Sequence, residues 1–187
     1  MKSKILDIAI QQMKKGGYDN LNFAHIASDL STTRANLHHH FKNKEGLALA
    51  ATETYLESQM QIVGAILLKH HGDILSIATE LEEYLIKTIK DNGSYNSCIC
   101  TQLIRDYGLP ESLKLIATDH FKKMENTFEN QIEISQKNGN LKSKEDPKRL
   151  AFKLMNNILG IYQYALIEEN QEELFKYTKG SLKSILE

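Results

Sequence analysis

The sequence predicts an all-α protein, and three observations support this fold class. The 187 residues include only two Pro and ten Gly. Long segments are rich in Leu, Ile, Ala, Lys, Glu and Gln, and most of these side chains lose little freedom in a helix. Apolar residues recur in these segments at helical spacing. At this length a chain buries a proper core, so we expect a helical protein that needs no disulfide or metal ion to hold it together.

The charge is distributed unevenly along the chain. The net charge is −1, but residues 1–50 hold seven Lys or Arg against four acids, which gives +3 for this segment and −4 for the rest. Neutralising phosphates requires local positive charge rather than a high total. A basic N-terminal segment followed by an acidic remainder is typical of a DNA-reading domain attached to a regulatory one.

The first predicted helix covers residues 3–15, where apolar residues follow helical spacing. Ser3 is available as its N-cap. The pair Gly16 and Gly17 supplies the stop that commonly ends a helix.

Two short helices are predicted next, at residues 22–30 with Asn22 as the cap and at residues 34–41. The polar turn 31–33 separates them, and Thr33 is placed to cap the second. A short helix, a tight polar turn and another short helix within about twenty residues have the spacing of a helix-turn-helix.

The remaining chain is predicted to be helical with short connections. A long helix begins at Lys44, capped by Asn43, and is long enough to join two domains. The other predicted elements are helices at about 73–90, 110–137, 147–169 and 172–186, a turn at 91–93 and an apolar stretch at 95–107 that ends at Gly108.

The stretch 26–47 carries a recognisable motif. It combines Ile26-Ala27, the pair Leu37 and Phe41, and the run Lys-Asn-Lys-Glu-Gly-Leu that ends at Leu47. With Ile5-Leu6-Asp7-x-Ala9 and Gly17-Tyr18 before it, this pattern resembles the TetR family of regulators over about residues 4–50.

Two positions depart from the family pattern. The family usually has Gly-Val-Ser before the recognition helix, whereas this chain has Ser31-Thr32-Thr33. Loss of the glycine removes an easy route to positive φ, so a slightly different turn is expected. His38 replaces an aromatic residue, which puts the operator sequence in question rather than DNA binding itself.

The resemblance implies a helix-turn-helix domain at 1–47 and a ligand-binding and dimerisation domain at 48–187. It implies a homodimer that binds a near-palindromic double-stranded operator, and a small-molecule effector that releases it. Arg34 and Asn36 have the chemistry to read guanine and adenine edges. The residues implied at bases or nearby phosphates are Arg34, Ala35, Asn36, His38 and His39, and those on the DNA backbone are Thr33, His40, Lys42 and Lys44.

The family analogy also implies a ligand cavity between the long helix and the helices after it, although apolar residues at helical spacing are equally well explained as core. The candidate lining residues are Tyr84, Cys98, Leu103, Tyr107, Phe121, Met124 and Tyr162. A surplus apolar face on the last two helices predicts the dimer interface, with Leu154, Ile158, Ile161, Ala165, Leu174, Tyr177, Leu182 and Ile185.

Cys98 and Cys100 are expected to be reduced, since they are too close in sequence for an ordinary structural disulfide. Cys98 is open to two interpretations: a sensor of oxidants or electrophiles, or a small buried residue. No metal or cofactor is expected. Consecutive His residues such as His38, His39 and His40 point about 100° apart and do not converge on one ion. The two cysteines have no further Cys or His at ligand spacing.

The longest apolar run, Ile62–Leu68, is far shorter than the roughly 20 residues that cross a bilayer. Asp7 interrupts what would be the apolar part of a secretory signal, so a soluble cytoplasmic protein is expected. A phosphate loop, a nucleophile elbow and paired metal-ligand motifs are absent, which argues against an enzyme. The sequence therefore predicts a ligand-responsive transcription repressor. The alternative is a helical ligand-binding or adaptor protein without specific DNA binding.

Overall fold

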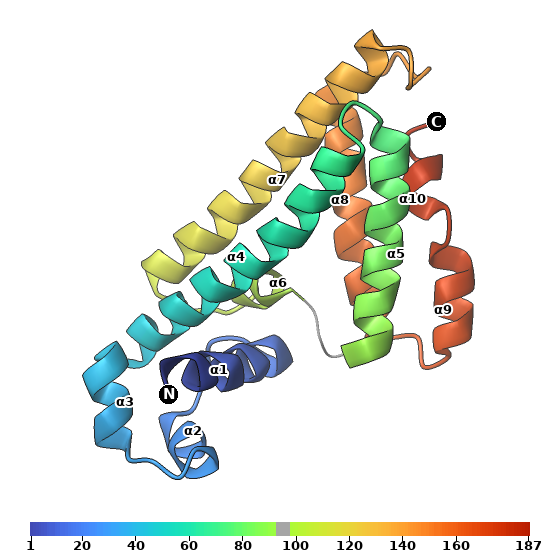
Figure 1. Ribbon diagram of the computed structural model, residues 1–187. Helices are drawn as coiled ribbons and strands as arrows, with labels where there is room; N and C mark the ends of the chain where they lie inside the picture. Colours follow the sequence, from blue (N-terminus) through green and yellow to red (C-terminus); the bar gives the residue numbers. More distant parts are fainter. Residues whose placement is uncertain (93–97) are drawn as a thin grey trace. The chain divides into compact units, whose positions relative to one another are not determined.

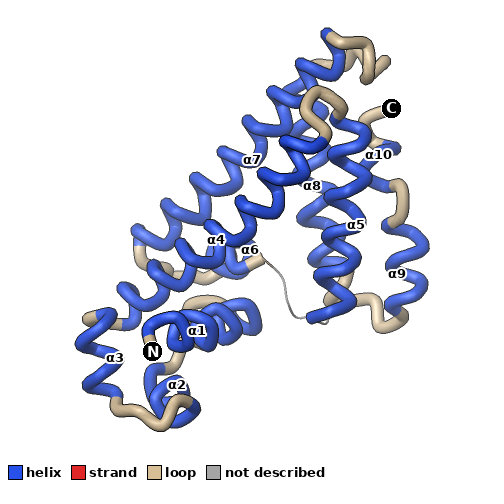
Figure 2. The backbone as a smooth tube through the Cα atoms, viewed as in Figure 1, coloured by secondary structure: helices blue, strands red, loops and turns tan. Residues whose placement is uncertain are grey.

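The computed structural model describes residues 1–92 and 98–187, and their regular elements are all helices (Figures 1 and 2). This confirms the predicted fold class. The helices are, in order, α1 (Lys2–Gly16), α2 (Phe23–Asp29), α3 (Arg34–Phe41), α4 (Lys44–Lys69), α5 (Ile74–Asn92), α6 (Ile99–Leu103), α7 (Glu111–Lys137), α8 (Pro147–Tyr164), α9 (Gln171–Thr178) and α10 (Ser181–Ser184).

The chain packs as two compact units. Unit 1 comprises residues 1–59 and 97–120, and unit 2 comprises residues 60–96 and 121–187. The domain boundary predicted after residue 47 lies within α4 and inside unit 1. None of the described helices combines the length and the apolar character needed to cross a membrane.

Unit 1 is built around α1, which packs against α2 and α6, while α2 packs against α3. The side chains that the helical pattern placed inward are buried. Ile5, Met13, Ile26 and Leu37 have no exposed surface, and Phe41 is 5% exposed. The predicted periodicity of the first three helices is therefore confirmed.

Side-chain caps fix where the helices of unit 1 begin. Asn22 Oδ1 accepts hydrogen bonds from the backbone N–H of Ala24 and His25, and Thr33 Oγ1 accepts one from Asn36. Asn43 Oδ1 accepts one of 2.7 Å from Gly46 at the start of α4. These three caps were predicted, and each satisfies a backbone donor that the helix itself leaves unpaired.

The prediction for the first cap was wrong. The helix α1 begins at Lys2, with Met1 at the N-cap position and no side-chain cap, so Ser3 lies inside the helix. The predicted stop at the other end is confirmed. The helix ends at Gly16, and Gly17 has a φ of 65° and donates its N–H to the Met13 carbonyl.

The turn between α2 and α3 keeps a residue with positive φ, although it lacks glycine. Ser31 has a φ of 50°. Its N–H bonds to the Ser28 carbonyl at 3.0 Å, and the Thr32 N–H bonds to the Ala27 carbonyl at 2.9 Å. This pair of bonds is the Schellman ending of a helix, which glycine normally occupies. The expected change of turn is therefore not seen at this position, because the serine adopts the strained conformation itself.

The elements α5, α8, α9 and α10 of unit 2 lie side by side (Figures 1 and 2). Their core includes Ile74, Ile77, Leu154 and Leu182, together with Phe128 of α7, and none of these side chains has exposed surface. Burial of this apolar surface is the main stabilising contribution to the unit.

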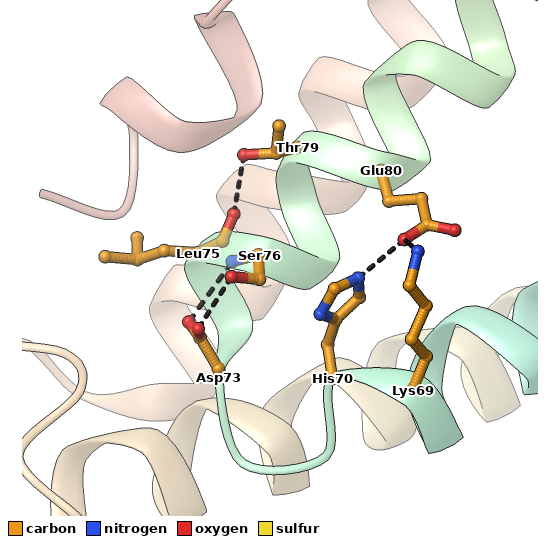
Figure 3. A network of polar contacts seen from close by, with 7 residues as sticks. All are labelled: Lys69, His70, Asp73, Leu75, Ser76, Thr79 and Glu80. Carbon is orange, nitrogen blue, oxygen red and sulfur yellow. Dashed lines mark hydrogen bonds and ion pairs between the residues drawn. The ribbon is translucent and has the colours of Figure 1, made fainter.

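A polar network closes the turn between α4 and α5 (Figure 3). The Glu80 carboxylate accepts hydrogen bonds from Lys69 Nζ at 2.7 Å and His70 Nε2 at 2.5 Å. The bonds from Lys69 and His70 lower the pKa of Glu80. Asp73 caps α5 through the N–H and hydroxyl of Ser76, at 3.2 and 2.6 Å. The predicted start of this helix at about residue 73 is therefore confirmed.

The C-terminal part differs from the single helix predicted at 172–186. It forms α9 and α10, separated by Lys179 and by Gly180 with a φ of 84°. The buried carboxylate of Glu82 accepts the N–H of Gly180 at 2.6 Å and that of Leu182 at 3.1 Å. These two bonds to a distant residue stabilise the break, because they pair backbone donors at the start of α10.

Two further boundaries differ. The helix α8 ends at Tyr164, five residues before the predicted end, and turns follow it. Within the predicted apolar stretch 95–107 the structure forms α6 only from Ile99 to Leu103. Tyr95 and the third residue of the predicted turn 91–93 lie outside the described residues.

Candidate nucleic-acid interface and cysteine cluster

The first turn of α3 is the exposed part of the helix-turn-helix. Thr33, Arg34 and Ala35 are exposed, whereas Leu37 is buried beneath them. The Thr33 cap holds one N–H of this turn at 3.2 Å. The N-terminus of a helix carries partial positive charge, so this turn is electrostatically suited to phosphate as well as to base edges.

Asn36 is held by the turn before α3. Its Nδ2 donates a hydrogen bond of 3.0 Å to Thr32 Oγ1, and the side chain is half-buried. Bidentate reading of adenine uses both the amide nitrogen and the oxygen. Asn36 must therefore release Thr32, or share its second amide hydrogen, before it reads a base.

The three consecutive histidines are exposed but differ in their contacts. His38 Nδ1 donates to the Lys42 carbonyl at 2.8 Å, and its ring centroid lies 4.8 Å from that of Phe23 in α2. These contacts give His38 a structural role in joining α2 to the end of α3. The rings of His39 and His40 stand edge to face at 5.6 Å. His39 and His40 thus remain the freer candidates for contacts with DNA.

The two candidate lysines also differ. Lys42 is exposed and has a φ of 62° at the end of α3. Lys44 Nζ donates to the Asp19 carbonyl at 3.1 Å and lies 4.7 Å from the centroid of the Tyr18 ring. Lys44 therefore fixes the start of α4 to the loop after α1, while Lys42 points its charge to solvent.

The predicted ligand-lining residues are divided between the two units. Tyr84 borders a groove of about 530 Å³ between α4 and α5. Met124 and Tyr162 pack in the core of unit 2, Leu103 is fully buried in unit 1, and Phe121 is half-buried. The side chain of Tyr107 differs from the others, because it is fully exposed.

The residues predicted at the dimer interface also need correction. Leu154, Ile161, Ala165, Leu174 and Leu182 belong to the core of their own subunit, because the apolar stripe that contains them packs on neighbouring helices. Ile158 and Ile185 are half-buried against the same core, and Tyr177 is 69% exposed. The exposed apolar residues on and just after α8 are instead Phe152, Tyr164, Leu166 and Ile167.

Residues at the start of α6 and in α7 form a cluster that the sequence did not predict. Residues two apart in a helix point about 200° apart. Cys98, however, precedes α6 with a non-helical ψ of 132°, and Cys100 lies in its first turn. The two sulfur atoms and a ring nitrogen of His120 in α7 consequently lie within 4.8 Å of one another. His120 was missed because it is twenty residues from Cys100 in sequence and only the fold brings it close.

The environments of the two free thiols differ. Hydrogen bonds from Cys100 and His120 hold the pKa of Cys98 well below its usual value, although burial acts in the opposite direction. The hydrogen bond to Cys98 and burial raise the pKa of Cys100. Cys98 is partly exposed, whereas Cys100 is buried. The thiolate, which is the nucleophilic form, is therefore favoured at Cys98.

One basic residue of α1 is electrostatically coupled to this cluster. Burial lowers the pKa of Lys14, while the charge of Cys98 raises it. Lys14 Nζ also lies 5.1 Å from the centroid of the Tyr55 ring in α4. The thiols of α6 are thus in electrostatic contact with the first helix of unit 1.

A comparison with protein families identifies the N-terminal segment of the chain. Residues 5–51 match the family model described as bacterial regulatory proteins, tetR family. A search of curated proteins finds no match.

Solved structures match over almost the whole chain. A TetR-family transcriptional regulator from Agrobacterium tumefaciens has a TM-score of 0.89 at 22% identity, covering 100% of this chain and 97% of its own. The reduced form of E. coli NemR has a TM-score of 0.83 at 16% identity, with coverages of 100% and 97%. A cysteine mutant of the regulator CifR, complexed with a 26-base-pair operator, has a TM-score of 0.81 at 19% identity, with coverages of 96% and 94%.

The sequence match thus covers the segment that contains the helix-turn-helix, and the structural match extends to the remaining helices. The chain therefore carries the DNA-binding domain of the TetR family and has the fold of TetR-family transcriptional regulators.

Proposed function

We propose that this protein is a transcription repressor that binds a near-palindromic operator as a homodimer and releases it in response to a small molecule. The observation that carries the proposal is the capped, solvent-exposed first turn of α3, with Arg34 next to the Thr33 cap. Occupancy of promoter DNA by such a dimer is sufficient to repress transcription. The test is transcription in vitro from a promoter that contains the operator, where added protein is expected to lower transcript yield. Unchanged or higher yield at full occupancy contradicts repression.

Within this proposal the contacts to DNA divide into two groups. Arg34, Ala35 and Asn36 face bases, with Arg34 suited to guanine and Asn36 to adenine. His39, which is exposed on α3, is also assigned to this face. The residues assigned to phosphates are Thr33, His40, Lys42 and Lys44, with His38 positioning the end of α3 through Lys42.

The dimer is proposed to form through α8 and α9. A groove of about 800 Å³ lies along these helices and is bordered by Phe152, Gly160, Tyr164 and Tyr177. Three of these are large apolar side chains at least 55% exposed, and exposed apolar patches mark interaction sites. A two-fold dimer presents two recognition helices, which is why a near-palindrome is expected.

Gly160→Arg tests this interface, because an added Cβ at this helical position meets no atom within 4 Å. The substitution therefore adds a charged side chain without disturbing its own subunit. We expect sedimentation at micromolar concentration to show dimers for the original protein and monomers for Gly160→Arg. Gly64→Arg is the matched control, since Gly64 lies in α4 and is equally open. Dissociation by the control alone, or by neither variant, contradicts this interface.

The effector is proposed to be a thiol-reactive small molecule that acts at Cys98. The Cys98 thiol adds to the β-carbon of an α,β-unsaturated aldehyde: a carbon–sulfur bond forms, the carbon–carbon double bond is lost, and the thiol proton is transferred to the α-carbon. The product fills space beside α6, which packs against α1. If the adduct is better accommodated when the two helix-turn-helix domains of the dimer do not match the spacing of the DNA grooves, it shifts the population of dimers away from the DNA-bound conformation.

The experiment uses reduced, chelator-treated full-length protein and acrolein as the probe. Mass spectrometry is expected to show one adduct per chain at Cys98, with parallel loss of operator binding. Cys98→Ser is expected to keep operator binding in the presence of acrolein. Cys100→Ser serves as the matched cysteine control and is expected to remain responsive. If Cys98→Ser loses operator binding in acrolein to the same extent, the assignment of Cys98 is contradicted. Operator binding itself is tested separately, with protein that has not been treated with acrolein.

A further inference from the structure

We propose that Cys98, Cys100 and His120 bind one thiophilic metal ion, with Zn²⁺ or Cu⁺ as the ions that match these ligands. The proposal rests on the convergence of three ligand atoms from two helices of unit 1, all within 4.8 Å of one another. Metal binding is measured without DNA, so the proposal does not depend on the function proposed above.

The ligand types are selective. Thiolate sulfur is a soft ligand that favours Zn²⁺ and Cu⁺, and imidazole also suits both ions. The hard cations Ca²⁺ and Mg²⁺ prefer oxygen, and none of the three converging side chains supplies one. The chemistry of the cluster therefore points to a thiophilic metal rather than to a general cation site.

The geometry is close to what a tetrahedral ion requires. Zn–S bonds of about 2.3 Å and Zn–N bonds of about 2.0 Å place the ligand atoms about 3.5 to 3.8 Å apart. Ligand atoms that lie within 4.8 Å of one another therefore need to approach by about 1.3 Å at most. Small χ rotations of the ligand side chains produce such a shift.

The charge balance also permits the ion. Two thiolates and one Zn²⁺ are together neutral, with His120 as a neutral ligand. Lys14 is the cation that interacts with Cys98, and it therefore faces a neutral cluster once the metal is bound. Three protein ligands leave the fourth tetrahedral position open, as in zinc sites that exchange a water or an exogenous ligand.

The test is a titration of the reduced, metal-free, full-length protein with Co²⁺, followed by displacement with Zn²⁺. We expect one Co²⁺ per chain, a sulfur-to-cobalt charge-transfer band, and the visible absorption of tetrahedral Co²⁺. Addition of Zn²⁺ is expected to remove these bands. Co²⁺ absorption typical of octahedral coordination by nitrogen and oxygen, without the sulfur band, overturns the proposal.

Variants identify the ligands. Removing only an outer-shell partner of a metal site costs about 10- to 100-fold in affinity, so Cys98→Ser and His120→Gln are expected to weaken Co²⁺ binding by more than about 100-fold. His71→Gln is the matched control, because His71 is exposed and lies outside the cluster. Circular dichroism checks that each variant is folded. The metal binding of Cys100→Ser is interpreted only if this variant is folded. Unchanged binding in both Cys98→Ser and His120→Gln overturns the proposal.

Discussion

The Asp106 carboxylate accepts a hydrogen bond of 2.8 Å from the backbone N–H of Tyr18, 88 residues earlier in the chain. Tyr18 follows α1, and Asp106 follows α6, which begins beside Cys98. This bond joins the turn after the first helix of the DNA-binding domain to the segment that carries the two thiols. It is a direct physical connection between the segment after α6 and the turn after α1.

Asp106→Ala is expected to weaken the coupling between the effector and DNA. The substitution leaves the Tyr18 N–H without its acceptor, which costs about 1 to 3 kcal/mol of folding stability. It also removes a link between α6 and α1, so acrolein is expected to lower operator affinity by a smaller factor than in the original protein. The ratio of operator dissociation constants with and without acrolein measures this.

Asp106→Asn is the matched control, because its side-chain oxygen still accepts the bond. It is expected to retain most of the response. The same ratio in Asp106→Ala and in the original protein would show that the signal does not travel through this contact, since coupling is established only by such a difference.

Gly17→Ala is expected to destabilise the protein through two effects. Gly17 has a φ of 65°, and an added Cβ would lie 2.4 Å from Asp106 Oδ2. With a φ of 65° and a ψ of −158°, Gly17 adopts a backbone conformation that is essentially restricted to glycine and costs an alanine about 1 to 3 kcal/mol, and the steric overlap adds to this. Gly139→Ala is the control, with a φ of 78° and open space around the added Cβ. Urea unfolding is expected to show a larger loss for Gly17→Ala. If both variants lost the same free energy of unfolding, the Asp106 side chain would have moved away from the added Cβ without loss of stability.

Arg34→Ala is expected to weaken operator binding by about 1 to 3 kcal/mol and to relax specificity at one base position. The helical signal in circular dichroism is expected to be unchanged, because Arg34 is exposed. Fluorescence anisotropy with operator variants measures both effects. Arg149→Ala provides the control, since Arg149 lies in α8 and pairs with Glu145. Unchanged affinity of Arg34→Ala would remove this residue from the interface.

Ser31→Gly is expected to stabilise the protein. An L-residue at positive φ costs about 1 to 2 kcal/mol, and the greater freedom of glycine in the unfolded chain offsets part of this gain. We expect a net gain of about 0.5 to 1 kcal/mol in urea unfolding. Ser28→Gly, the same change inside α2, is expected to destabilise by about 0.5 kcal/mol, the difference between the helix propensities of serine and glycine. Loss of stability in Ser31→Gly would show that the serine side chain stabilises the turn in a way that outweighs its strain.

Much of unit 1 was predictable because its signals are local. Asn22, Thr33 and Asn43 cap helices only two or three residues ahead, and the inward positions of α1 to α3 follow one helical period. The left-handed Ser31 was not predicted, since a serine gives no sign that it will occupy a position suited to glycine.

The remaining differences depend on contacts between distant residues. The break at Gly180 is stabilised by Glu82, 98 residues away, and His120 reaches the cysteines only through the packing of α7. Five of the residues predicted at the dimer interface, Leu154, Ile161, Ala165, Leu174 and Leu182, lie in the core of their own subunit for a related reason. Periodicity identifies an apolar stripe on α8, but it does not tell whether Leu154 or Phe152 faces the core of the subunit.

Selection of bound duplexes from a random DNA library, followed by a salt titration of the best sequence, tests the central claim most directly. The account predicts a near-palindromic consensus. It also predicts an affinity that falls steeply with salt, because each phosphate neutralised releases counterions. Folded, metal-free and effector-free protein that yields no consensus would contradict the repressor and favour a helical binding or adaptor protein instead.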